Sequence, residues 1–544
     1  MTSEALQQNI NDDVNLQQWA QVKLKLAKIY KGGGEKATAK LREKNKYTVR
    51  ERIEKLIDPN TNFLEIGAFA GYQMYAEQGG CPAGGTVGGL ATISGKTCVI
   101  LANDPTVKAG AWFPITGKKN LRLQEIAMEN DLPIIYLVDS AGVFLPMQDE
   151  IFADKEHFGR IFRNNAVMSA QGISQLAAVF GPCVAGGAYL PIMSDETLMV
   201  KGNGSIFLAG PYLVKAAVGE HVDAETLGGA ETHTQISGVA DYNCENETEC
   251  IATLRKIIEK LPKQKANFFE QTKAAQPYFN PADINKYFAT EGKPYDVLNI
   301  IKCIADADSL IIYKEDYGRS ILTTYAKING WHVGIVANNR LVQKNKKGEV
   351  QIGGVIYNDS ADKAARFIMN CNQKQIPLIF LQDVTGFMVG SRSEHAGIIK
   401  DGAKLVNAVA NSVVPKITII TGNSYGAGNY AMCGKAYDPR FIYAWPTAKI
   451  AVMGGEQAAK TLMQIQVATL KAKGETITAD METEMFNKIK ANYDAQSTIY
   501  YAAARLWVDE IIEPLKTRDY ITQSLQACSL KKYMADFKTG VFQV

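Results

Sequence analysis

The feature that most limits how this chain can fold is an internal duplication. The segment PIIYLVDSAG at 133–142 matches PLIFLQDVTG at 377–386. The segment GPCVAGGAYLPIMS at 181–194 matches GNSYGAGNYAMCGK at 422–435. The two offsets, 244 and 241 residues, are nearly equal, and such repetition indicates a repeated structural unit. We therefore expect two copies of one α/β unit.

Each copy has the pattern of a strand, a crossover helix and a second strand. In the first copy, the continuous apolar run at 133–138 predicts a buried parallel strand, and 175–180 predicts the next one. In the second copy, the apolar spacing over 396–413 predicts the intervening helix. The fold class is therefore α/β. A chain of 544 residues is long enough for two such domains.

The domain boundaries are predicted from changes in composition along the chain. Residues 14–58 have helical patterns and precede the strands, which predicts an N-terminal helical arm within residues 1–58. From 262 to about 293 the chain is polar and rich in Lys and Gln, as inter-domain linkers are. We expect one domain at 1–275, including the arm, and a second at 276–544.

Small residues end the strands of both copies, and they place bare backbone N–H groups in one crevice. Gly186 and Gly187 also open a helix, whose first N–H groups are unpaired and carry partial positive charge. Such a turn can hold a developing oxyanion. For an isolated glycine pair, tight packing of helix on strand is the favoured alternative. The recurrence of the turn in the second copy favours the anion site.

A basic cluster stands near the predicted start of a helix at about 116–130. Lys118 and Arg122 are four residues apart and share a face, with Lys119 between them. Cations in a first turn oppose the helix dipole, which makes sense if an anion such as a nucleotide phosphate binds there. A solvated basic face is the alternative.

The crevices have rival chemical interpretations. The string GNSYG at 422–426 resembles a nucleophile elbow around Ser424, but that arrangement requires a later histidine, and the last histidine is His395. Asp139 and Asp383 stand at strand ends, where each could cap the following turn. Without a clear nucleophile or base, the pattern favours transfer between two carbonyl-bearing substrates, each held in an anion-stabilising site.

Composition excludes several other classes of function. The net charge is +3 with no basic block, so no nucleic-acid partner is expected. The nine cysteines are scattered without a CxxC pair, so no metal site is expected. No apolar run is long enough to span a membrane, and the polar, acidic N-terminus is not typical of a signal or transit peptide. We expect a soluble, intracellular, cytoplasmic protein.

Long stretches of the chain resemble one family, the carboxyltransferase β subunits of biotin-dependent acyl-CoA carboxylases. The resemblance is strongest to the branch that acts on 3-methylcrotonyl-CoA and covers about 47–544. It rests on DKEHFGRIFRNNAVMSA (154–170), GSIFLAGPYLVKAAVGE (204–220), LGGAETHTQISGVADY (227–242), FMVGSRSEHAGIIKDGAKLVNAVA (387–410), SYGAGNYAMCGKAYDPRFIYAWPTAKIAVMGGEQAA (424–459) and DFKTGVFQV (536–544).

The resemblance implies two tandem crotonase-like domains with active sites at dimer interfaces. It implies that CoA is held mainly by the first domain and biotin mainly by the second, with the biotin carried on a partner chain. It assigns one oxyanion hole to Gly186 and Gly187 and the other to Ala427 and Gly428. It places Ala141 and Gly142 along one substrate site and Thr385 and Gly386 along the other. With the basic cluster described above, the candidate substrate-binding residues are Ala141, Gly142, Lys118, Lys119, Arg122, Thr385, Gly386 and Phe387.

The resemblance also implies a homo-hexameric core within a complex with the subunit that carries biotin carboxylase and biotin. The first strand end reads SAGVFLP, where SGGANLP is expected, so the acyl group stays open among methylcrotonyl, propionyl, geranyl and others. A decarboxylase acting on glutaconyl-CoA and a non-catalytic assembly scaffold are the remaining alternatives.

Overall fold

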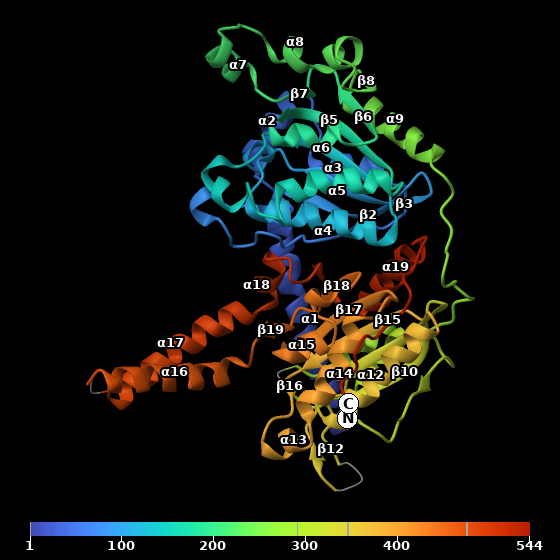
Figure 1. Cartoon of the computed structure of the whole chain (residues 1–544), viewed down its shortest axis with the longest axis vertical. Coiled ribbons are helices and arrows are strands. Elements are labelled where there is room, and N and C mark those ends of the chain that lie inside the picture. Colours follow the sequence, from blue (N-terminus) through green and yellow to red (C-terminus); the bar gives the residue numbers. More distant parts are fainter. Residues whose placement is uncertain (1, 291, 345–347, 475–476) are drawn as a thin grey trace.

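A computed structural model describes residues 2–290, 292–344, 348–474 and 477–544. The chain forms two lobes, each built around one eight-stranded sheet (Figure 1). The two sheets have the same topology: an antiparallel hairpin is followed by parallel strands. In each sheet one short strand pairs with the strand that leads into the small-residue turn, β7 with β5 and β19 with β17. This confirms the duplication and the α/β class.

The first sheet runs in the order β1-β2-β3-β4-β5-β6-β8, and β7 pairs with β5. Its strands are β1 Leu64–Glu65, β2 Thr86–Ile93, β3 Lys96–Asn103, β4 Ile134–Ser140, β5 Gln175–Val184, β6 Glu196–Val200, β7 Ser205–Phe207 and β8 Tyr242–Cys244. The helices around it are α4 Pro114–Asn130, α5 Phe158–Ala170, α6 Gly186–Ile192, α7 Pro211–Val218, α8 Ala224–Gly228 and α9 Glu247–Lys260.

The second sheet runs in the order β20-β18-β17-β15-β11-β10-β9, and β19 pairs with β17. Its strands are β9 Ile311–Ile312, β10 Ile321–Ile328, β11 Trp331–Asn338, β15 Leu378–Val384, β17 Lys416–Tyr425, β18 Phe441–Ala444, β19 Lys449–Ala451 and β20 Glu510–Ile511. Two short pairs lie outside it, β12 Gln343–Lys344 with β13 Val350–Gln351, and β14 Val355–Ile356 with β16 Gly386–Phe387.

The helices of the second lobe include the predicted crossover helix. They are α10 Ile284–Tyr287, α11 Val297–Ile304, α12 Asn358–Gln373, α13 Ser391–His395, α14 Ile398–Ala410, α15 Ala427–Ala431, α16 Gly455–Ala472, α17 Ala479–Ser497, α18 Ile499–Ala504 and α19 Thr517–Ser529. The helix expected over 396–413 is α14, which stops at Ala410. Helices α16 and α17 form a hairpin that projects from the lobe (Figure 1).

The N-terminal arm packs against the second lobe, although it precedes the first in sequence. The arm consists of α1 Ser3–Ile29, α2 Glu35–Glu43 and α3 Val49–Leu56. In α1, Asn15 donates hydrogen bonds to the carbonyls of Asn285 and Phe288, at 3.1 and 3.0 Å, and Val22 is buried in a cluster with residues of β17 and β18. The later part of the arm, α3, packs on the first sheet.

The linker expected over 262–293 is irregular only in its first part. Residues 262–280 contain no helix or strand. The rest folds as α10 and the loop after it, because Ile284 and Phe288 are buried in the main hydrophobic core. This core draws residues from both lobes, so the lobes share one packed interior. Among the described residues, no helix combines the length and apolarity needed to cross a bilayer.

Candidate functional site

The first small-residue turn joins β5 to α6 beside the end of β4. Its pivot is Ala185, with φ 54° and ψ −122°. A positive φ is unusual for a residue with a side chain and stores strain of the kind found at functional sites. The next residues, Gly186 and Gly187, form the first turn of α6, and Ala188 is the first whose N–H bonds backwards, to the Ala185 carbonyl at 3.0 Å.

The second turn repeats this geometry between β17 and α15. Its pivot is Gly426, with φ 54° and ψ −144°, and here glycine avoids the steric cost. Asn429 is the first residue of α15 whose N–H bonds backwards, to the Gly426 carbonyl at 3.1 Å. The N–H groups of Ala427 and Gly428 therefore have no helical acceptor. Each lobe presents one pair of N–H donors at a strained or glycine-only turn, which is the arrangement that stabilises an oxyanion.

The strand end lies closer to the second turn than to the first. A Cβ on Gly187 would lie 3.5 Å from the Ser140 hydroxyl oxygen and 3.7 Å from the Gly142 Cα. A Cβ on Gly428 would lie 2.6 Å from a Val384 methyl group and 3.4 Å from the Gly386 Cα. The second turn thus tolerates no side chain at its second helical position.

The strand-end residues expected along the sites lie beside the two turns. Gly142 adopts φ 86°, and its N–H donates to the Ser140 hydroxyl at 3.1 Å. The exposed Ala141 donates its N–H to the Ala109 carbonyl at 3.0 Å. In the second lobe, Thr385 donates its N–H to the Gly354 carbonyl at 2.8 Å. These amides are occupied internally, so they shape the two sites and leave anion binding to the helix starts.

Phe387 continues the second strand end and packs under α14. A Cβ on Gly402 of that helix would lie 2.8 Å from the Phe387 ring, so the absence of a side chain there admits the ring. The half-buried Phe387 therefore forms a wall next to Gly386.

Neither turn contains a competent nucleophile. Ser424 is fully buried, and its hydroxyl donates to the Gln382 side chain at 2.6 Å and accepts from the Asn429 amide at 2.7 Å. The matched Cys183 is also buried, and burial raises the pKa of its thiol well above the usual range. The elbow interpretation of Ser424 is therefore wrong, because the hydroxyl is held inside the protein without a histidine partner.

Two of the three cations proposed for phosphate binding serve the interior instead. The Lys119 ammonium is buried and donates to the carbonyls of Gly67, Ala83 and Thr86 at 3.0, 2.9 and 2.5 Å. Burial lowers its pKa to about 8. Three acceptors satisfy all its donors, so Lys119 has none left for a phosphate.

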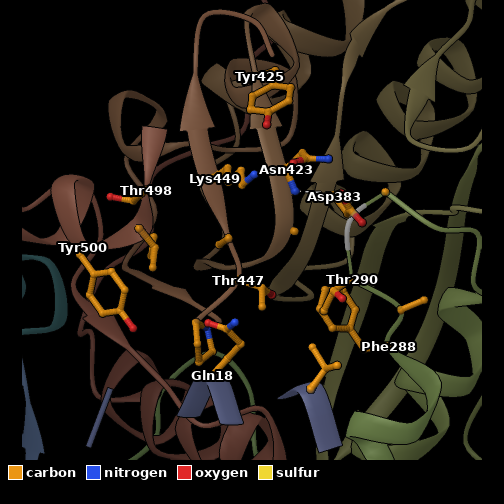
Figure 2. A pocket seen from close by; sticks show the side chains of 17 residues that line it. Gln18, Phe288, Thr290, Asp383, Asn423, Tyr425, Thr447, Lys449, Thr498 and Tyr500 are labelled. Carbon is orange, nitrogen blue, oxygen red and sulfur yellow. Dashed lines mark hydrogen bonds between the residues drawn. The ribbon is translucent and has the colours of Figure 1, made fainter. Parts of the chain in front are cut away.

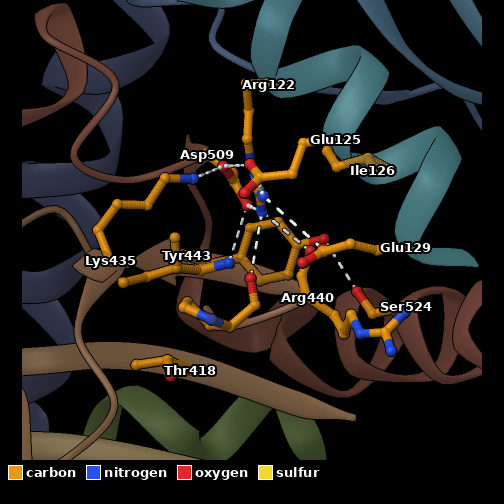
Figure 3. Close-up of polar contacts among 12 residues, drawn as sticks. Arg122, Glu125, Ile126, Glu129, Thr418, Lys435, Arg440, Tyr443, Asp509 and Ser524 are labelled. Carbon is orange, nitrogen blue, oxygen red and sulfur yellow. Dashed lines mark hydrogen bonds and ion pairs between the residues drawn. The ribbon is translucent and has the colours of Figure 1, made fainter. Parts of the chain in front are cut away.

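Arg122 has a structural role as well, at the junction of the two lobes. Its guanidinium makes a bidentate contact with Asp509, with both N···O distances 2.8 Å (Figure 3). The same guanidinium donates to the Arg440 carbonyl at 2.9 Å. Attraction from Arg122 and Lys435 holds the pKa of the Asp509 carboxyl well below its usual range. The assignment of Lys119 and Arg122 to CoA phosphates is corrected accordingly.

Lys118 is the remaining candidate of this cluster. Its side chain is exposed and its ammonium donates to the Arg505 carbonyl at 2.6 Å. Partial burial, with Lys435 and Arg505 nearby, lowers its pKa. A cation beside two other cations is suited to a polyanionic ligand.

The aspartates at the strand ends do not cap the turns that follow them. Asp139 forms a buried ion pair with Lys46 at 2.6 Å and with Arg52 at 3.1 Å. Asp383 accepts hydrogen bonds from the Tyr295 hydroxyl at 3.0 Å and the Asn423 N–H at 2.8 Å. The capping expectation is wrong, because each carboxyl group is directed into the protein rather than along its own turn.

Sequence reasoning missed a pair of buried asparagines that anchors both strand ends. The Asn103 side-chain oxygen accepts the Asp139 N–H at 3.4 Å, and the Asn338 oxygen accepts the Asp383 N–H at 3.2 Å. The signal was present, since ILAN ends at 103 and IVAN ends at 338, again one repeat apart.

Two duplicated α/β lobes, each with an oxyanion-type turn, define a crotonase-like carboxyltransferase architecture. Residues 40–539 match the family model described as carboxyl transferase domain. The chain is 47% identical to the mitochondrial methylcrotonoyl-CoA carboxylase beta chain of Arabidopsis thaliana, over 95% of this chain and 87% of that protein. It is 45% identical to the biotin-dependent 3-methylcrotonyl-coenzyme A carboxylase beta1 subunit of Mycobacterium tuberculosis, over 94% of each.

The structural comparison agrees with these relatives. The beta subunit of P. aeruginosa geranyl-CoA carboxylase aligns with a TM-score of 0.86 and 35% identity, over 99% of this chain and 97% of that one. The chain belongs to the carboxyl transferase family, as a carboxyltransferase β subunit of the biotin-dependent acyl-CoA carboxylases.

Proposed function

We propose that this chain transfers a carboxyl group from carboxybiotin to 3-methylcrotonyl-CoA, giving 3-methylglutaconyl-CoA. The observation that carries the proposal is the pair of matched turns, each with two N–H donors that have no helical acceptor. The choice of acyl group is supported by the relatives named for methylcrotonoyl-CoA, which are 47% and 45% identical. Because the structural neighbour acts in a geranyl-CoA carboxylase, geranyl-CoA is the second candidate.

The two turns have distinct roles in this proposal. Gly186 and Gly187 donate to the thioester oxygen of the acyl-CoA as it becomes an enolate, which removes the need for a charged side chain in the site. Ala427 and Gly428 donate to the carbonyl oxygen of the ureido ring of biotin. The tight contact of Gly428 with Val384 fits a planar ring that must approach the backbone closely. Bound carboxybiotin supplies the carboxyl group and, once that has left, a nitrogen that can accept the substrate proton.

The remaining site residues hold the substrates. Ala141 and Gly142 line the acyl site, and Thr385, Gly386 and Phe387 line the biotin site. Lys118 contacts a phosphate of CoA. Figure 1 places α6 in one lobe and α15 in the other. The proposed active site therefore pairs the first lobe of one subunit with the second lobe of another, within a homo-hexameric core.

Exposed apolar side chains in both lobes support such pairing. In the first lobe they include Phe152 and Tyr212, exposed by 77% and 92%. In the second lobe, the segment TLMQIQVATL at 461–470 of α16 contains no charged residue, and Ile465 in it is 58% exposed. Exposed apolar patches are typical of interfaces between subunits.

The biotin is proposed to be carried by a partner subunit that also carries biotin carboxylase. The test mixes the purified chain with ATP, bicarbonate and acyl-CoA, with and without that partner. Carboxylation that requires both polypeptides is the expected result, and turnover by this chain alone with free biotin would overturn the division of labour. A decarboxylase would release CO₂ from the carboxylated thioester instead, and a scaffold would bind no acyl-CoA in calorimetry.

A further inference from the structure

A cavity of about 570 Å³ opens in the second lobe between α1, the loop after α10, β19 and α18 (Figure 2). It lies on the other side of β17 from α15. Side chains alternate along a strand, so Ser424, which bonds to Asn429 of α15, faces one side, while Asn423 and Tyr425 face the cavity. The cavity is therefore separate from the turn that we assign to biotin.

The aspartate of the duplicated strand end, Asp383, lines this cavity. Its counterpart in the first lobe, Asp139, is neutralised by Lys46, whose ammonium lies 2.6 Å away, and by Arg52 at 3.1 Å. The Lys46 ammonium lies beside Gly181, 2.8 Å from where a Cβ on that glycine would stand. In the second lobe, the one cation within 4 Å of Asp383 among the described residues is the buried Arg340, with an N···O distance of 3.4 Å that makes no hydrogen bond. The other partners of this carboxylate are neutral, the Tyr295 hydroxyl and the Asn423 N–H. The cavity beside Asp383 in the second lobe thus corresponds to the place beside Asp139 that the Lys46 ammonium occupies in the first lobe.

The equivalence of the two places rests on three matched residues. Asn103 and Asn338 each bond to the N–H of the following aspartate. A Cβ on the matched glycine, Gly422, would lie 2.4 Å from the Asp383 carboxyl carbon. In the first lobe, a Cβ on Gly181 would collide with Asp139 in the same way. Both lobes thus have the same asparagine, aspartate and glycine around this place, but the second lobe has no counterpart of Lys46 within the described residues.

A cation elsewhere on the wall of the cavity can hold an anion. Lys449 lines the cavity and is an exposed residue. A lysine ammonium pairs with a carboxylate through a charge-assisted hydrogen bond.

We propose that this cavity binds a small zwitterion of the α-amino acid class. Its ammonium group lies beside Asp383, in the position that Lys46 takes in the first lobe. Its carboxylate accepts a hydrogen bond from Lys449. Apolar wall residues, Phe288 and Ile499 among them, leave space for an aliphatic side chain. The proposal goes beyond the carboxyltransferase reaction and does not depend on it.

Calorimetry on the full chain with three probes tests the proposal. L-norvaline carries both charged groups, n-butylamine lacks the carboxylate, and pentanoate lacks the ammonium. We expect norvaline to bind with a Kd below about 1 mM, with butylamine weaker and pentanoate weakest. Absence of any heat with norvaline up to about 10 mM would overturn the proposal.

Two variants and one matched control locate the binding. Lys449→Gln should weaken norvaline binding roughly tenfold, as expected for the loss of one charge-assisted hydrogen bond, and leave butylamine unchanged. Lys473→Gln, an exposed lysine outside the cavity, should bind both as wild type does. Asp383→Asn should abolish binding of both amines. Norvaline binding that is unaffected by Lys449→Gln would refute the site, even if Asp383→Asn fails to fold.

Discussion

Replacing Arg122 by methionine should destabilise the protein and leave the affinity for CoA unchanged. The side chain is 5% exposed and joins α4 of the first lobe to Asp509 of the second, which is fully buried (Figure 3). Breaking a buried ion pair by removing one partner typically costs about 3–5 kcal/mol, since a charge is left uncompensated. Asp509 would keep Lys435 at 2.9 Å and the Ile442 N–H at 2.9 Å.

These remaining partners place the expected cost at the lower limit, about 3 kcal/mol. For a unit of about 250 residues this lowers Tm by roughly 6–12 °C, which a thermal scan followed by circular dichroism measures. The matched control is Lys118→Met, one turn earlier on the same helix and exposed. It should change the free energy of unfolding by no more than about 0.5 kcal/mol. It should raise the KM for acyl-CoA at low salt, and this increase should become smaller as the salt concentration rises.

The pair of variants separates the structural from the phosphate-binding interpretation. A wild-type Tm for Arg122→Met, together with a raised and salt-dependent KM, would refute the reasoning. Asp509→Leu should destabilise the protein further in the Arg122→Met background, because Lys435 and the Ile442 N–H would then lose their acceptor as well.

Three further predictions concern the turns and the junction between the lobes. Gly187→Pro and Gly428→Pro each remove one N–H donor, and each variant alone should be nearly inactive. Refolding the two variants together should restore about a quarter of wild-type activity, because half of the dimers are mixed and each mixed dimer has one intact site. If mixed dimers are present and no activity returns, the shared-site model is rejected. Ser424→Ala should keep kcat within about tenfold of wild type, whereas a loss of about 10³ or more would revive a nucleophilic serine. Burial raises the pKa of Glu510 to about 8, so its carboxyl holds a proton in the folded chain that the unfolded chain has lost above about pH 4.5. Stability should therefore fall as pH rises from about 4.5 to 8, and Glu510→Gln should make urea unfolding less dependent on pH over that window; an identical slope would contradict the assignment.

The repeat made the sheets and the two turns predictable from sequence. At strand ends such as 139–142 and 383–386, small residues follow an apolar run. The backbone conformation there depends on neighbouring residues in the sequence and can therefore be predicted. The turn geometry followed because small residues, Ala185-Gly186 and Gly426-Ala427, stand where a helix must start directly after a strand.

Contacts between distant segments were not predictable in the same way. The residues around Arg122 in the sequence do not indicate its contact with Asp509, 387 residues later. The helical pattern alone therefore does not distinguish the buried Arg122 from the exposed Lys118. For the same reason the arm was assigned to the first domain, although α1 packs on the second lobe. The boundary at residue 275 stays a prediction.

The most direct test of the central claim is the transfer half-reaction with this chain alone. The purified protein is incubated without ATP with 3-methylglutaconyl-CoA labelled in the transferable carboxyl group, and loss of label from the thioester is followed with and without free biotin. The account predicts label loss that requires biotin and disappears in both Gly187→Pro and Gly428→Pro. Label loss that is independent of biotin, or that persists undiminished in both variants, would contradict it.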